Sequence, residues 1–311
     1  MSGARGDSIS KYLAFNAEVS QARARGTPIV ALETTIVTHG MPYPQNIATT
    51  RSVEALIRAG GATPATIAVI EGQIHIGLDD GQLERLAQTS NVRKLSRADL
   101  PFAIAAGEPG STTVAATMIC AALAGIEVFV TGGIGGVHRG AETTMDVSAD
   151  LAELARTPVS VICAGAKALL DLPKTLEALE TGGVPVVCYR SDEFPAFWSR
   201  SSGLAAPLRL DSAAEIAKFI GVKRDLGLDG GVLVANPIGE ADEIPANEMR
   251  PFIEAAVSDA QRKRITGKDV TPYLLDRLGA LTNGRSLTAN IALVENNARL
   301  GAELALAVRR T

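Results

Sequence analysis

The sequence predicts a single α/β domain, in which a mostly parallel sheet has helices on both faces. Short aliphatic runs alternate with amphipathic helical stretches along the chain, and this alternation is typical of crossover connections between parallel strands. Hydrophobic residues make up 46% of the chain but aromatic residues only 4%, so the core must consist of Ala, Val, Ile and Leu, as in buried parallel strands. The 311 residues contain no internal repeat or Pro-rich linker, which favours one domain over residues 1–311.

Aliphatic runs mark the expected strands, and the first clear run ends at Glu33. The second run contains Gly72, which favours a hairpin bent at that residue. The expected strands are residues 28–33, 66–76, 103–106, 127–131, 159–164, 184–189 and 231–235.

Helical periodicity fills the stretches between these strands. The last segment, 247–310, is expected to be helical with breaks near Gly267 and Gly284, and residues 1–8 are expected to be a flexible tail. The other expected helices are residues 47–59, 83–88, 112–124, 149–156, 174–180 and 213–225.

Net charge, hydropathy and cysteine content argue against some classes of function. A net charge of −4 argues against a polymeric nucleic acid as partner, because such proteins usually present a basic face. No uncharged run reaches the length that crosses a membrane. The three cysteines lie in apolar segments without metal-type spacing, so we expect reduced buried thiols in a cytoplasmic protein. They are Cys120, Cys163 and Cys188.

Lys167 is the most informative candidate, because it follows an apolar run whose last residues are small. An ammonium at the end of a buried strand is poorly hydrated, and poor hydration lowers the pKa of lysine. A neutral lysine is a nucleophile that forms a Schiff base with an aldehyde or ketone. The alternative is that Lys167 begins the following helix and points to water.

Glu33 closes the first strand, and a loop containing Gly and Pro follows it. Ligands of parallel sheets bind beyond the carboxyl ends of the strands, so this carboxylate is well placed for proton transfer. A helix cap or a surface acid is the alternative interpretation.

Residues 107–113 precede a helix and contain suitable capping residues. Ser111 or Thr112 can cap this helix, and the free amides at its N-terminus form an anion site for which phosphate is the expected ligand. Lys94 lies shortly upstream and can neutralise a phosphate. Ordinary capping and a solvated surface lysine are the alternatives.

The glycine-rich stretch 128–140 lacks the spacing of a dinucleotide-binding motif, but it lets a flat ligand approach the backbone, and His138 lies on it. Asp146 and Asp150 follow, the first expected at or before a helix cap and the second in the first turn. Their carboxylates suit a hard divalent ion such as Mg²⁺ or Mn²⁺. Two acids at a helix N-terminus are favourable without any metal, which is the alternative.

Two further segments contain candidates. Residues 189–203 include the single Trp and two of the seven Phe residues, and form either a lid over a pocket or a loop that packs its aromatic side chains inward. Asn290, near the start of the last helix, can pair with a base edge or stabilise the turn.

Several blocks, in order along nearly the whole chain, resemble the pseudouridine-5′-phosphate glycosidase family, also called pseudouridylate synthase. The blocks are residues 31–46, 110–118, 131–150, 163–167, 192–197, 235–238 and 288–291. The resemblance implies a three-layer α/β/α subunit with a mixed, mostly parallel sheet, and a homotrimer. It also implies the reaction, in which pseudouridine 5′-phosphate and water reversibly give uracil and ribose 5-phosphate.

The resemblance implies roles for individual residues. Lys167 is expected to be the Schiff-base nucleophile, Glu33 the proton donor, and Asp146 the ligand of one Mn²⁺ ion whose other positions are filled by water. Substrate contacts are expected from Lys94, Thr112, Val114, Thr131, His138, Ser148, Ala149, Asp150 and Asn290.

Two other functions are open. A Schiff-base aldolase acting on another sugar phosphate would use the same lysine and phosphate site, and uracil-dependent consumption of ribose 5-phosphate separates the two. A nucleotide-binding regulatory domain would bind its ligand without turnover, but it has no need of Lys167, Glu33 and Asp146 together.

Overall fold

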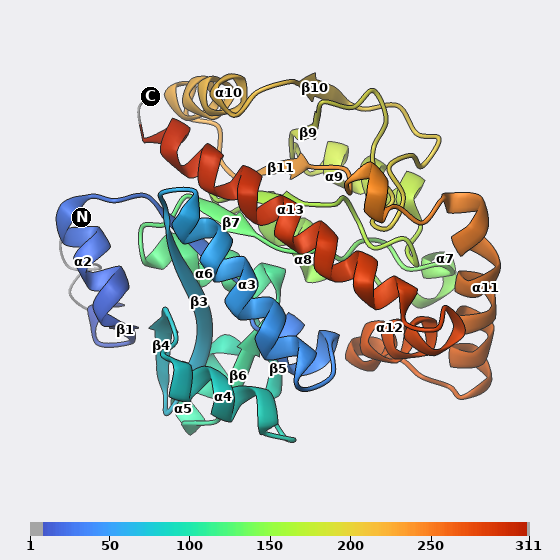
Figure 1. Ribbon diagram of the computed structural model, residues 1–311, viewed down its shortest axis with the longest axis horizontal. Helices are drawn as coiled ribbons and strands as arrows, with labels where there is room; N and C mark the ends of the chain where they lie inside the picture. The colour runs from blue at the N-terminus through green and yellow to red at the C-terminus, as the bar shows by residue number, and fades with distance from the viewer. Residues whose placement is uncertain (1–8, 310–311) are drawn as a thin grey trace.

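An 11-stranded sheet runs through the centre of the molecule, and helices cover both of its faces (Figure 1). The structure is a computed structural model that describes residues 9–309, so the tail expected at 1–8 lies outside the described residues. A single α/β domain with a mixed, mostly parallel sheet is therefore confirmed. Among the described residues, no helix has both the length and the apolar character needed to cross a membrane.

Most neighbouring strands run parallel. The order is β1-β4-β3-β2-β7-β8-β11-β9-β10, with β5 joined through β6 to β3. Within residues 9–309, the antiparallel pairs are β3 with β4 and β3 with β6. The strands are β1 Leu13–Phe15, β2 Ile29–Leu32, β3 Thr63–Ile70, β4 Gln73–Ile76, β5 Arg93–Leu95, β6 Gly110–Thr112, β7 Val128–Val130, β8 Ser160–Cys163, β9 Val186–Tyr189, β10 Leu208–Leu210 and β11 Val232–Ala235.

Helices α3, α10 and α13 pack together on one face of the sheet, and α6, α8 and α9 lie on the other (Figure 1). Helices α11 and α12 pack against each other and stand beside the sheet. The helices are α2 Ala17–Arg25, η1 Ile36–Gly40, α3 Gln45–Ala59, α4 Asp80–Gln88, α5 Leu100–Ala106, α6 Val114–Leu123, α7 Ala141–Thr144, α8 Ala149–Leu154, α9 Leu172–Thr181, α10 Ala213–Asp225, η2 Glu240–Asp242, α11 Ala246–Arg262, η3 Gly267–Asp269, α12 Val270–Leu281 and α13 Arg285–Val308.

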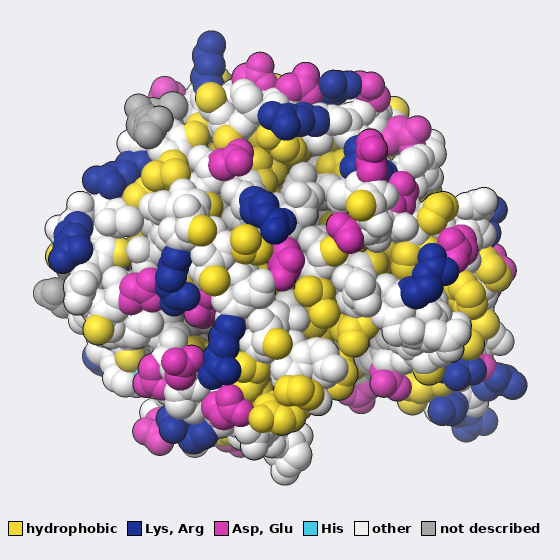
Figure 2. Space-filling model, viewed as in Figure 1, with side chains coloured by type: hydrophobic (Ala, Val, Ile, Leu, Met, Phe, Trp, Pro, Cys, Tyr) yellow, Lys and Arg dark blue, Asp and Glu magenta, His cyan; other side chains and the backbone are white. Residues whose placement is uncertain are grey.

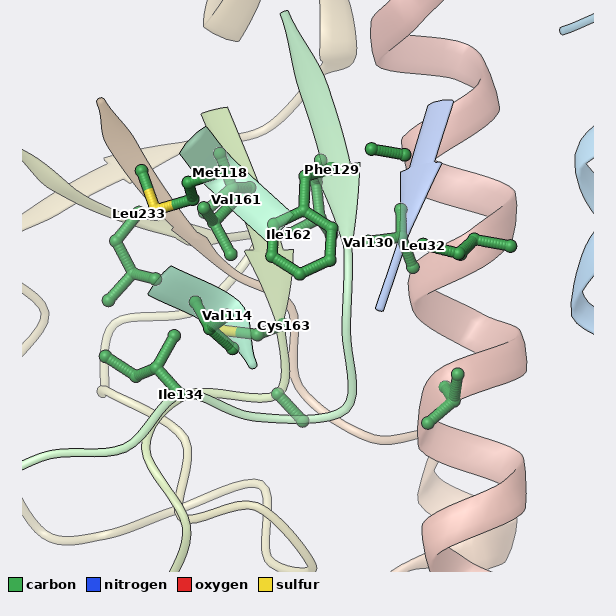
Figure 3. Close-up of a cluster of buried hydrophobic side chains, with 14 of the residues drawn as sticks. Leu32, Val114, Met118, Phe129, Val130, Ile134, Val161, Ile162, Cys163 and Leu233 are labelled. Carbon is green, nitrogen blue, oxygen red and sulfur yellow. The ribbon is translucent and has the colours of Figure 1, made fainter. Parts of the chain in front are cut away.

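The core is aliphatic, as the composition predicts, and its centre lies around β7 and β8 (Figure 3). Phe129 is the large side chain there; it is fully buried and stands opposite Val161 of the neighbouring strand. Helix α13 approaches β7 so closely that a Cβ atom on Gly301 would lie 2.2 Å from Val130 Cγ2. This glycine lets the last helix rest directly on the strands that end at the site.

Two details of the predicted elements are wrong. Residues 103–106 are not a strand but the end of α5, because Pro at the first turn and Gly107 at the C-cap enclose a short helix whose Ala-rich end reads like a buried strand. The helix expected from residue 112 begins at Val114, since residues 110–112 pair with β3 and β5 as strand β6.

The hairpin expected at Gly72 is confirmed, with Glu71 and Gly72 both at positive φ between β3 and β4. The breaks expected in the last segment are confirmed at Gly267, where η3 begins, and at Gly284, which is the N-cap of α13. The short strands β1, β5, β6 and β10 were missed, because each has only three residues and, unlike β7, none is a run of buried apolar side chains.

Candidate active site

A cavity of about 310 Å³ opens beyond the carboxyl ends of β2, β7 and β8. Each of these adjacent parallel strands is followed by one polar side chain that lines the cavity: Glu33 after β2, Thr131 after β7, and Lys167 in the loop after β8. The loops beyond parallel strands are where ligands bind in such sheets. Glu33 and Lys167, which the sequence predicted at strand ends, thus line the same cavity.

Glu33 is buried, with 7% of its surface exposed. The hydroxyl of Thr131 donates to one carboxylate oxygen and the hydroxyl of Thr35 donates to the other. Burial raises the pKa of Glu33 to about 7, and the nearby ammonium of Lys167 partly opposes that rise. A carboxyl group with this pKa can both give and take a proton near neutral pH.

Lys167 is half-buried and faces the cavity. Its Nζ donates to the carbonyl oxygen of Gly133 at 2.7 Å. The next helix begins only at Leu172, so Lys167 does not begin a helix and point to water. The turn before it needs a glycine, because Gly165 has φ +84° and a Cβ atom there would lie 2.3 Å from the Pro195 carbonyl oxygen.

Lys94 is brought to the same cavity by β5, a strand that the sequence did not reveal. Its Nζ donates to the carbonyl oxygen of Lys268 at 3.2 Å. Burial lowers the pKa of Lys94, and the ammonium of Lys167 lowers it further. Two lysine side chains that line one cavity favour an anionic ligand.

Asp150 ties two walls of the cavity together. Its Oδ1 accepts from the backbone N–H of Ala115 at 3.0 Å, and its Oδ2 accepts from the N–H of Gly135 at 2.8 Å. Helix α6 is capped by Thr113 rather than by Ser111 or Thr112, since Thr113 Oγ1 accepts from the N–H of Ala116. Backbone amides at the start of α6, which were expected to bind phosphate, therefore already donate to protein oxygens.

The other expected contact residues lie at the cavity with one exception. Thr112 is fully buried behind it, where its hydroxyl donates to the Ile67 carbonyl oxygen at 2.8 Å, and Thr113 lines the cavity instead. Those that do line it are Val114, Thr131, His138, Ser148, Ala149, Asp150 and Asn290.

Asp146 lies at the edge of the cavity, and its side chain is 38% exposed. The Nδ1 atom of His138 is 3.9 Å from Asp146 Oδ2, and burial lowers the pKa of His138. Within residues 9–309, no group of three His, Cys, Asp or Glu side chains gathers around a common point. Asp146 offers a partly exposed carboxylate, the kind of ligand that a hard divalent ion takes together with water.

Several lining residues were missed from the sequence. His39, on the π-helix η1, lines the cavity, and burial lowers its pKa. Phe197 contributes to the wall, while the aromatic loop 189–203 packs inward: Phe194, Phe197 and Trp198 are all buried. Other lining residues that the sequence did not reveal are Thr35, Ser96, Gly267, Lys268, Thr271, Pro272 and Leu275.

Comparisons with known proteins agree with this geometry. The family described as indigoidine synthase A like protein matches residues 18–307. A pseudouridine-5′-phosphate glycosidase of Solibacter usitatus (strain Ellin6076) is 65% identical over 294 residues, covering 94% of this chain and 98% of that protein. A protein of the same name from Jannaschia sp. (strain CCS1) is 64% identical over 296 residues, covering 95% and 98%.

A solved structure shares the fold over nearly its whole length. The prealnumycin C-glycosynthase AlnA, in complex with ribulose 5-phosphate, superposes with a TM-score of 0.89 at 36% identity, covering 96% of this chain and 98% of that chain. The fold and the strand-end cavity thus define an α/β enzyme. The chain belongs to the pseudouridine-5′-phosphate glycosidase family, as the sequence resemblance indicated.

Proposed function

We propose that this chain catalyses the reversible cleavage of the carbon–carbon glycosidic bond of pseudouridine 5′-phosphate, giving uracil and ribose 5-phosphate. The observation that carries the proposal is that Lys167 and the protonatable Glu33 share one cavity with a second lysine, Lys94. The names and identities of the relatives support the choice of substrate. The complex of AlnA with ribulose 5-phosphate is in keeping with a pentose phosphate at such a site.

The bond to be broken joins ribose C1′ to uracil C5, so the leaving atom is carbon. Ordinary glycosidases expel an oxygen or nitrogen leaving group with two carboxylates and an oxocarbenium-like transition state. A carbon leaving group needs a proton and an acceptor for the bonding electrons on the sugar. An amine nucleophile and one proton-transfer acid meet these needs, and the cavity contains one of each.

The sugar ring opens first. The N1 lone pair of uracil moves through C6 and C5 to form a C5–C1′ double bond, while the C1′–O4′ bond breaks and Glu33 gives its proton to O4′. The neutral amine of Lys167 then adds to C1′, which restores the uracil ring. The proton lost from the nitrogen passes to the Glu33 carboxylate.

The carbon–carbon bond breaks next. A proton from Glu33 is added to C5, the lone pair of the Lys167 nitrogen forms an iminium with C1′, and the C1′–C5 electrons return to the uracil ring. Water then adds to the iminium carbon, with one of its protons passing to Glu33 and the other to the departing amine. Ribose 5-phosphate leaves as the aldehyde, and both side chains return to their starting states.

The remaining residues bind and orient the substrate. We assign substrate contacts to Lys94, Val114, Thr131, His138, Ser148, Ala149, Asp150 and Asn290, and to Thr113 in place of Thr112. Asp150 also acts through the backbone, because its two carboxylate oxygens fix the amides of Ala115 and Gly135.

We assign Mn²⁺ binding to Asp146, with water as the other ligands. A divalent ion at the edge of the cavity supplies positive charge near an anionic substrate, as hard cations do in phosphate sites. We also propose, on the family resemblance, a cytoplasmic homotrimer in which residues 1–311 form one domain. Sedimentation equilibrium tests the subunit number.

The direct experiment is incubation with pseudouridine 5′-phosphate and Mn²⁺, following uracil and pentose phosphate release. Equal amounts of the two products are expected. A Schiff-base aldolase would consume ribose 5-phosphate without uracil, and a binding domain would release no uracil, so either result would remove the proposal.

A further inference from the structure

We propose that Lys268 is a second phosphate-binding residue of this site, and that it closes the roof of the cavity by meeting Lys94 across the phosphate group of the substrate. The inference rests on the proposed function and extends it by giving the phosphate a second cation from a distant part of the chain.

The roof of the cavity comes from the pair of helices that stands beside the sheet. Gly267 and Lys268 of η3 line the cavity together with Thr271, Pro272 and Leu275 of α12. Helix α12 also packs against η1, the π-helix that follows Glu33. A movement of the α11–α12 pair would therefore open or cover the residues that the proposed reaction uses.

Lys94 and Lys268 hold each other by a reciprocal pair of hydrogen bonds. Lys94 Nζ donates to the Lys268 carbonyl oxygen at 3.2 Å, and Lys268 Nζ donates to the Lys94 carbonyl oxygen at 3.1 Å. This contact brings two ammonium groups together at the wall of one cavity. Like charges so placed repel, and a doubly charged phosphate between them would remove that repulsion.

The two lysines differ in their carboxylate partners. Lys268 Nζ lies 2.6 Å from Asp99 Oδ2, and the Lys268 side chain is still 52% exposed. Among the described residues, no carboxylate lies within ion-pair distance of Lys94, whose ammonium donates to the Lys268 carbonyl oxygen. Asp99 thus holds the roof lysine beside the cavity, whereas Lys94 forms no ion pair with a carboxylate within residues 9–309.

The three lysines that line the cavity have different tasks in the proposed reaction. The positive charges of Lys167 and Lys268 both disfavour the ammonium form of Lys94. Lys167 must act as a neutral amine at C1′, so it does not serve as the counter-charge of the phosphate. The phosphate is at the other end of the opened pentose, where Lys94 and Lys268 meet.

The test compares Lys268→Met with the wild type in the direction of synthesis. The KM for ribose 5-phosphate is expected to rise about tenfold, as for the loss of one charge-assisted hydrogen bond, while the KM for uracil stays the same. Lys268→Arg should recover part of the loss. Lys263→Met is the matched control, because Lys263 follows α11 in the same pair of helices and lies outside the cavity, over the ring of Tyr273. It should leave both KM values unchanged.

Two binding measurements do not depend on turnover. Calorimetry with ribose 5-phosphate should give a dissociation constant about tenfold weaker for Lys268→Met than for the wild type. Ribose 5-phosphate should slow hydrogen exchange in residues 265–275 of the wild type but not of this variant.

Equal binding of ribose 5-phosphate by the variant and the wild type would overturn the inference. So would an equal rise in both KM values, which indicates a structural effect. If the wild type releases no uracil from pseudouridine 5′-phosphate but the binding difference is found, the proposed function fails and the phosphate role of Lys268 stands.

Discussion

The floor and the roof of the cavity are built in different ways. The floor consists of loops that follow β2, β7 and β8, and its polar groups are tied to the protein: Thr131 donates to Glu33, and Lys167 donates to the Gly133 carbonyl. The roof consists of η3 and the start of α12, and it is anchored by contacts that reach solvent, such as Lys268 with Asp99. Figure 2 shows Lys and Arg side chains gathered at the outer end of the α11–α12 pair, with charges of both signs elsewhere on this face.

This difference indicates that the floor carries out the chemistry and that the roof admits and releases the substrate. Moving a proton and forming a covalent bond require fixed geometry and little water, and the buried floor supplies both. Admitting and releasing a charged substrate requires a part that moves, and elements with few buried contacts supply it. Changes in the floor should therefore lower kcat, and changes in the roof should raise KM.

The largest effect is expected from Lys167→Arg. Arginine keeps the positive charge but forms no Schiff base, so kcat for uracil release should fall by at least about 10⁴-fold. Steady-state kinetics measure the loss, and an unchanged circular-dichroism spectrum shows that the variant is folded. A wild-type rate in this variant would remove the covalent mechanism altogether.

Glu33→Gln tests the second group of the floor. The amide can accept the hydroxyl hydrogen bonds of Thr35 or Thr131 but cannot give a proton to O4′, so kcat should fall about 10²- to 10⁴-fold. The KM for pseudouridine 5′-phosphate should change little, in contrast to Lys268→Met. A fall confined to KM would place Glu33 in binding rather than in proton transfer.

The same variant should be more stable at alkaline pH. The pKa of Glu33 is about 7 in the folded chain and 4.5 in the reference state, so the folded protein binds this proton more tightly. Its contribution to stability is present below pH 4.5 and is lost as the pH rises to about 7. Glu33→Gln should therefore gain about 3 kcal/mol in unfolding free energy over the wild type at pH 8 relative to pH 4.

Denaturant unfolding at the two pH values measures this gain. Glu142→Gln is the comparison, because Glu142 is exposed and pairs with Lys174, which lowers its pKa. Glu142→Gln should not gain stability over the wild type as the pH rises. If the unfolding free energies of the wild type and Glu33→Gln depended on pH in the same way, the pKa of the Glu33 carboxyl would not be raised by burial.

A smaller effect is expected at the edge of the cavity. Asp146→Ala should lower activity about tenfold to a hundredfold, with partial recovery in excess Mn²⁺, since water can replace one missing ligand. Full activity of the wild type after thorough chelation would exclude the metal from this site.

The floor could be predicted from sequence and the roof could not. Glu33 and Lys167 each follow an aliphatic run directly, so local pattern and the rule for strand ends were enough to place them together. Lys268 meets Lys94 from 174 residues away, and nothing near it in the sequence resembles a site. His39 was hidden for another reason, since a single π-turn leaves no periodicity to detect.

The two wrong predictions of secondary structure also have identifiable causes. Thr112 and Thr113 are both suitable caps, and the pairing of Thr112 with Leu95 of β5 decides that the helix starts after Thr113. The Ala-rich end of α5 has no period of its own, so its run of apolar residues alone suggested a strand. For the start of α6 a strand pairing selected between two acceptable local structures, and for α5 the Pro in its first turn and Gly107 at its C-cap did so.

The covalent link between Lys167 and the sugar is tested most directly by borohydride reduction in the presence of ribose 5-phosphate, followed by mass spectrometry of the peptides. The mechanism predicts one reduced pentose phosphate adduct, on the peptide that contains Lys167, and none in Lys167→Arg. An adduct on another lysine, or none on an active sample, would contradict it.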